Sequence, residues 1–63
     1  MAKINRTARL VKGQAGLGPE QDPTTAPAGA TVQVDAITDG GRLAHIIYGR
    51  AGGYTPVSNL VFI

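Results

Sequence analysis

The sequence predicts an all-β fold, built as a small closed sheet of about five short strands. Residues 31–38, TVQVDAIT, alternate apolar and polar side chains with the period of two that a half-buried strand shows. Glycine-rich turns follow at residues 39–41 and 49–53, and no stretch has the period of an amphipathic helix. The chain has 63 residues, which is short enough for one domain over residues 1–63. Short strands between glycine turns favour a small antiparallel barrel.

The N-terminal half is predicted to supply one strand and one long loop. Residues 6–12 alternate imperfectly and are interpreted as the first strand, after a tail over residues 1–5. Residues 13–30 hold four glycines and three prolines, which disfavour both a helix and a central strand. Because proline stiffens an extended backbone, we expect this segment to be a long, extended loop.

The C-terminal half, residues 31–63, is predicted to form the core of the barrel. Its strands are expected at residues 31–38, 42–48, 54–57 and 61–63. Residues 39–41, Asp-Gly-Gly, predict a tight turn because glycine adopts positive φ without a Cβ clash. Residues 58–60 suit a single 3₁₀ turn. Pro56 lacks a backbone donor, and so the strand that contains it should end there or lie at an edge.

Two apolar runs do not alternate. Residues 46–48 read Ile-Ile-Tyr, and residues 60–63 read Leu-Val-Phe-Ile. Only one face of a strand points into a small barrel, and so some of these side chains should be left for the loop at residues 13–30 or for another chain to cover. Burying three of them contributes about 5–8 kcal/mol, which is comparable to the stability of a small domain. The residues expected to contact a partner are Ile47, Tyr54, Leu60 and Phe62.

Basic residues are concentrated at the N-terminus. Residues 1–12 contain Lys3, Arg6, Arg9 and Lys12 and no acid, whereas the whole chain has a net charge of +2. We interpret this segment as a basic arm that contacts phosphates or an acidic partner surface, and a solvated terminus is the alternative. Deleting the arm is then expected to leave the barrel folded but to prevent assembly.

No residues form a recognisable catalytic or metal-binding set. His45 lies in an apolar strand with no acid near it in the sequence, and so it is expected to be half-buried, bonded to backbone or facing a partner. Asp35 and Asp39 are interpreted as a solvated face and a turn residue, not as a metal pair. The glycines at residues 49–53 open no helix and do not predict a phosphate-binding loop. The sequence therefore predicts no enzyme, no catalytic residues, no cofactor and no metal.

The chain lacks the apolar stretches that membranes and export require. No run approaches the roughly 20 apolar residues of a membrane span, and the first residues contain no apolar signal core. There is also no cysteine, so no disulfide can stabilise so small a fold. These observations favour a protein assembled inside a cell, with a partner chain as its stabiliser and no membrane partner.

The last 35 or so residues carry a family resemblance. A glycine at 29 enters a strand, a Gly-Tyr-Thr-Pro segment occupies residues 53–56, and Ser58-Asn59 precedes a closing apolar strand. In these features residues 29–63 resemble the Src-homology-3-like barrels, including their bacterial and phage relatives. The resemblance implies a five-stranded barrel in which residues 13–30 form the long loop between the first two strands.

The sequence departs from the members of that family that bind proline-rich peptides. Those members use a shelf of aromatic side chains, but Arg42 to Ala44 stands where the resemblance implies a tryptophan, and Leu60 where it implies a tyrosine. The ending is also similar to the plasmid-borne type II dihydrofolate reductases. Their reactive Gln-Ile-Tyr would fall on residues 53–55, which read Gly-Tyr-Thr, and so that activity is not expected.

The functional hypothesis is a non-enzymatic structural protein that binds neighbouring protein subunits, including copies of itself. A bacteriophage virion assembled in the host cytoplasm is the favoured setting, with the chain as a capsid decoration (cement) protein or a small head–tail component. Its partner contacts would include Lys3, Arg6 and Arg9. One alternative is a free-standing module that binds a peptide or glycan in a groove between residues 13–30 and 38–42. Another is a small nucleic-acid-binding barrel, which would bind with strong salt dependence.

Overall fold

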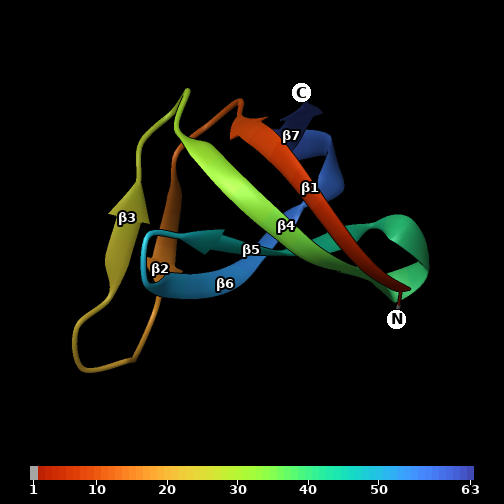
Figure 1. Cartoon of the computed structure of the whole chain (residues 1–63). Coiled ribbons are helices and arrows are strands. Elements are labelled where there is room, and N and C mark those ends of the chain that lie inside the picture. Colours follow the sequence, from red (N-terminus) through yellow and green to blue (C-terminus); the bar gives the residue numbers. More distant parts are fainter. Residues whose placement is uncertain (1) are drawn as a thin grey trace.

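A computed structural model describes the backbone of residues 2–63 and the side chains of residues 4–63. Most of the chain forms a five-stranded antiparallel sheet in the order β6-β5-β4-β1-β7 (Figure 1). Its strands are β1 (Ala2–Leu10), β4 (Thr31–Thr38), β5 (Leu43–Tyr48), β6 (Ala51–Pro56) and β7 (Leu60–Phe62). A separate hairpin pairs β2 (Gln14–Leu17) with β3 (Thr24–Ala26). Two 3₁₀ turns, η1 (Asp39–Gly41) and η2 (Val57–Asn59), connect strands of the sheet.

The all-β prediction is confirmed, and β4 occupies the predicted residues. The predicted turn at residues 39–41 is also present, with positive φ at all three residues. The predicted boundary of β6 was wrong, because this strand begins at Ala51 and the preceding turn is shorter than expected. Gly52 and Gly53 pair with β5 and belong to the sheet.

The long loop predicted at residues 13–30 was wrong in part, because it contains the β2–β3 hairpin. Its three prolines all lie outside the two strands, where no ladder donor is needed. Gly16 and Gly18 take positive φ, which bends the chain at and just after β2. The segment is therefore folded back on itself and does not extend away from the sheet (Figure 1).

The prediction that residues 1–12 form a basic arm was wrong. Strand β1 lies inside the sheet, between β4 and β7, and its pairing with β4 begins at Ala2. Ala8 and Leu10 of β1 are buried in the core. Removing residues 1–12 would take out a strand with two hydrogen-bonded neighbours, and so the structure favours loss of the fold in a deletion variant over the expected folded remainder.

The core is formed by alternate residues of the sheet and closed by the hairpin. On β5 the inward pair is Ala44 and Ile46, and Leu43 and Ile47 lie on the opposite face, where both are half-buried. From the hairpin, Leu17 is only 1% exposed. The buried apolar residues are Ala8, Leu10, Leu17, Ala26, Val32, Val34, Ala36, Ala44, Ile46, Ala51 and Leu60.

The two edges of the sheet differ. The hairpin approaches β6, where the backbone N–H of Gly18 donates to the carbonyl of Gly52 at 2.9 Å. Strand β7 has β1 as its neighbour in the sheet. Within residues 2–63, β6 and β7 are not paired with each other, so strand pairing does not close the sheet into the predicted barrel. Among the described residues no helix is long and apolar enough to cross a membrane.

Candidate functional site

The predicted partner-contact residues occupy three different environments. Leu60 is 9% exposed and belongs to the core of its own chain. Ile47 is half-buried on the outer face of β5, and Tyr54 is 53% exposed on β6. The side chain of Lys3 lies outside the described residues. No partner chain is present, and so whether these residues bind one stays a prediction.

The two arginines of β1 lie on opposite faces of the strand. Arg6 is on the side of Ala8 and Leu10, and its guanidinium carbon lies 5.1 Å from the centroid of the Phe62 ring. Arg9 is on the outer side, directly opposite Val61 of β7. Because strand residues alternate between faces, these two charges do not form a single basic surface of the kind that nucleic acid favours.

An exposed surface that we call the β1–β7 patch combines Arg9 with the apolar side chains around it. It consists of Arg9, Val11, Val61 and Ile63, and its three apolar side chains are 52%, 55% and 61% exposed in that order. The backbone N–H of Ile63 donates to the carbonyl of Thr7 at 3.0 Å, and the N–H of Val11 donates to the carbonyl of Asn59 at 2.9 Å. These two bonds hold the segments that carry the patch side by side. The sequence predicted an apolar excess in this last strand and assigned it to Leu60 and Phe62, whereas the structure buries Leu60 and exposes Val61 and Ile63.

A second cluster lies on the outer face of the other half of the sheet. The Nδ1 atom of His45 and the Oδ1 atom of Asp35 are 2.6 Å apart, and the two side chains are 29% and 46% exposed. The Tyr54 ring stands edge-on to the imidazole, with 5.0 Å between the ring centroids. Gly52 lies close to the imidazole, since a Cβ there would come 3.3 Å from its Cε1 and Nε2 atoms.

His45 is half-buried as expected, but its imidazole meets the carboxylate of Asp35, which the sequence did not predict. Asp35 is ten residues away in the sequence, but the β4–β5 pairing is irregular between Val34 and Ala36 and brings it beside the imidazole. Regular pairing of the two strands around the turn at residues 39–41 would set Asp35 opposite Ile46, on the other face from His45, and so no signal in the sequence indicated this contact.

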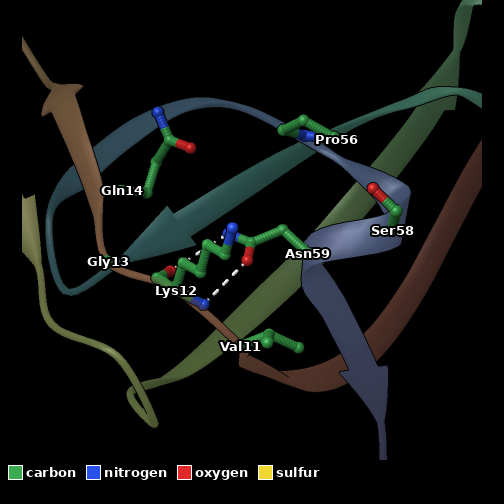
Figure 2. A pocket seen from close by; sticks show the side chains of 7 residues that line it. All are labelled: Val11, Lys12, Gly13, Gln14, Pro56, Ser58 and Asn59. Atoms are coloured by element: carbon green, nitrogen blue, oxygen red, sulfur yellow. Dashed lines mark hydrogen bonds between the residues drawn. The ribbon is translucent and has the colours of Figure 1, made fainter.

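A pocket of about 360 Å³ lies between η2 and the start of the hairpin (Figure 2). Lys12 is the charged residue of its wall, and Gln14 and Ser58 add neutral polar groups. Val11 and Pro56 supply the apolar part. The full lining is Val11, Lys12, Gly13, Gln14, Pro56, Ser58 and Asn59. The wall thus combines a cation and polar groups with apolar surface.

Asn59 holds this pocket together. Its Oδ1 atom accepts from the backbone N–H of Lys12 at 2.8 Å, and its Nδ2 atom donates to the Lys12 carbonyl at 3.0 Å (Figure 2). The same Nδ2 donates to Oγ1 of Thr55, which is fully buried, at 3.1 Å. Because its side-chain amide makes hydrogen bonds to both Lys12 and Thr55, Asn59 fixes η2 against the segment that follows β1.

A smaller pocket of about 270 Å³ lies where the hairpin meets the turn between β5 and β6. Asp22 and Arg50 both line it, together with Pro19, Thr24, Tyr48 and Ala51. The hairpin therefore faces the turn at residues 49–50. The groove between residues 13–30 and 38–42 that the module alternative predicted is not among these pockets.

Within the described residues, no three histidine or acidic side chains come together in a way that could hold a metal ion. The Asp35–His45 pair lines neither pocket. It lies on the outer face of the sheet, with the Tyr54 ring beside the imidazole. Comparison of this chain with protein-family models, curated proteins and solved structures found no match.

Proposed function

We propose that this chain is a non-enzymatic structural subunit that binds neighbouring protein chains through the β1–β7 patch. The supporting observation is that three large apolar side chains of the patch are each more than half exposed around one arginine. Contiguous exposed apolar surface of this kind is typical of protein contact sites. The favoured setting is a bacteriophage virion assembled in the host cytoplasm, with the chain as a capsid decoration protein or a small head–tail component.

The patch by itself is a weak contact. Covering the exposed parts of Val11, Val61 and Ile63 would contribute about 2–5 kcal/mol, on the scale of about 1.5–3 kcal/mol for a fully buried side chain. A micromolar complex requires about 8 kcal/mol. A subunit with such a patch therefore needs either additional contacts or several linked contacts, and a repeating particle supplies the second.

Sedimentation velocity of the purified chain, from low micromolar to near-millimolar concentration, tests the proposal. We expect reversible association that is lost in a Val61→Lys/Ile63→Lys double variant, because each lysine would place a charge in the apolar contact. The fold should persist, since both side chains are more than half exposed. Thr25→Lys, at an exposed position on β3, is the matched control and should associate normally. A folded monomer over the whole range contradicts the self-association of this subunit.

We further propose that the sheet and hairpin together form a Src-homology-3-like barrel. The order β6-β5-β4-β1-β7, with the long segment between β1 and β4 and a 3₁₀ turn before the last strand, supports this. The bond from Gly18 to Gly52 brings the hairpin to β6, where a barrel would close. An experimental structure in which the hairpin lies away from β6 would contradict this arrangement.

A second candidate function is a free-standing peptide-binding module, and the Asn59-braced pocket favours it. The pocket presents one cation, polar groups and an apolar surface, a combination that suits an extended peptide with a polar side chain. This function predicts a monomer. It also predicts that Lys12→Ala and Gln14→Ala weaken peptide binding without changing the melting temperature, which calorimetric titration and thermal unfolding can measure together.

A further inference from the structure

We infer that the open edge of β7 binds an extended acidic segment of a partner protein as an additional antiparallel or parallel strand. This rests on the proposed function and specifies the kind of partner that a neighbouring subunit presents. The inference follows from three properties of the edge: its unpaired backbone groups, the arginines on both faces, and the lack of acidic side chains in β1 and β7.

The backbone of Phe62 points away from the sheet. In an antiparallel pair, successive residues direct their N–H and C=O groups alternately toward the partner strand and away from it. The N–H of Ile63 is bonded to Thr7 on β1, and Phe62 is the preceding residue. Its N–H and C=O groups are therefore directed toward the free edge, where they can pair with an incoming strand.

The opposite edge of the sheet differs from this one. There the Gly52 carbonyl of β6 already accepts the N–H of Gly18 from the hairpin. Within residues 2–63, β7 is paired with β1 alone. Strand addition is thus favoured at β7 over β6.

The side chains around β7 define the charge of the partner. Arg9 stands opposite Val61 on the outer face, and on the other face the Arg6 guanidinium lies over the Phe62 ring, 5.1 Å from its centroid. Strands β1 and β7 contain no aspartate or glutamate. A strand laid along β7 would therefore lie near a cation on each side of the sheet. Alternate residues of that strand share one face, and so carboxylates on the inner face would meet Arg6 while the outer face is left for apolar residues.

The partner should also carry apolar side chains. On the outer face, Val61 and Ile63 are 55% and 61% exposed, and residues directly across from them on an added strand would cover this surface. A second copy of the chain is disfavoured as the added strand, because pairing β7 with itself would bring arginines together and supply no carboxylate. The inferred occupant is a segment in which apolar and acidic residues alternate.

The test uses a capped octapeptide of alternating valine and glutamate, kept at concentrations where it is monomeric. The full chain is made by chemical synthesis, with and without an N-methyl group on the Phe62 amide. We expect binding, with amide NMR shifts concentrated in residues 60–63, and roughly tenfold weaker binding when the Phe62 amide is methylated. The control is an N-methyl group at Gly40, exposed in η1, which should bind the peptide as the unmodified chain does.

The charge requirement is tested with a valine–lysine octapeptide and with an Arg6→Gln/Arg9→Gln variant. The lysine peptide should not bind, and the double variant should bind the glutamate peptide roughly tenfold more weakly. Equal binding of both peptides, no binding of either, or full affinity after methylation of Phe62 would overturn the inference. If the chain associates in sedimentation but fails these tests, the subunit function stands and strand addition is rejected. If it binds the peptide but remains monomeric, self-association is the part that fails.

Discussion

At the scale of single residues, a few polar and small side chains hold the segments around the pocket in place. Asn59 is the clearest case, since one amide bonds the N–H and the carbonyl of Lys12 and the buried hydroxyl of Thr55. The amide of an asparagine resembles a peptide group, and so it can continue a backbone ladder where the strand has ended. The sequence predicted a 3₁₀ turn at residues 58–60, close to the observed η2, but it did not indicate that Asn59 would brace two segments.

Asn59→Ala should lower the free energy of unfolding by about 2–4 kcal/mol, because three hydrogen bonds are lost and the Thr55 hydroxyl loses a partner. Urea denaturation followed by circular dichroism measures this change. Ser58→Ala, at the exposed neighbouring position, is the control and should stay within about 0.5 kcal/mol of the parent. Equal effects of the two substitutions would show that the amide does not brace the structure.

The close packing of Leu17 against β6 leaves room only for a glycine at position 53. A Cβ at this position would come 2.5 Å from Cδ2 of Leu17, whose side chain is almost fully buried. Gly53→Ala should therefore destabilise the fold by about 1–3 kcal/mol, as overpacking does. In a Leu17→Ala background the obstructing methyl group is absent, and the cost of Gly53→Ala should largely disappear in a double-mutant cycle. Additive effects would mean that the two residues do not meet.

At the scale of elements, β1 and the β2–β3 hairpin have different roles from those that composition indicates. Four basic residues in residues 1–12 favoured an arm, but β1 pairs on both sides and buries Ala8 and Leu10. Glycine and proline favoured an open loop in residues 13–30, but Leu17 and Ala26 of the hairpin belong to the core. In both segments, a few apolar side chains that point into the core determined the structure.

A chain that lacks residues 1–12 should fail to fold. The deletion removes one strand from the interior of the sheet and leaves both β4 and β7 without a neighbour on that side. Circular dichroism and the loss of NMR dispersion would report this. Arg6→Gln/Arg9→Gln keeps the strand while removing its charges, and it should fold normally. A folded deletion variant would restore the interpretation of residues 1–12 as an arm.

At the scale of the whole molecule, the sheet and hairpin share one core. Leu17, Ala26 and Ala51 pack in the same buried cluster as Val34 and Ile46. A chain of this length buries too little surface for two independently stable parts. The hairpin and the sheet should therefore unfold together.

Native-state hydrogen exchange tests this cooperativity. The protected amides of the β2–β3 hairpin and those of β4 should give the same free energy of opening, because neither part keeps its core when the other unfolds. A hairpin that opens with a clearly lower free energy would show that it is only loosely attached to β6. In that case the two parts of the proposed barrel would not form a single unit.

The sequence by itself determined the fold class, the alternation of β4 and the turn at residues 39–41. These features depend on local properties, namely the period of two in a half-buried strand and the freedom of glycine at positive φ. It also indicated that the last apolar strand has more apolar surface than one face can bury. The contact function inferred from that surface remains a proposal.

Only the tertiary structure decided which faces and neighbours these residues have. It buried Leu60 and exposed Val61 and Ile63, it placed β1 between two strands, and it brought Asp35 to His45. The physical reason is that register and strand order depend on pairing between distant segments, and a shift of one residue exchanges the two faces of a strand. Such pairing is set by the packing of the whole core, which no local pattern contains.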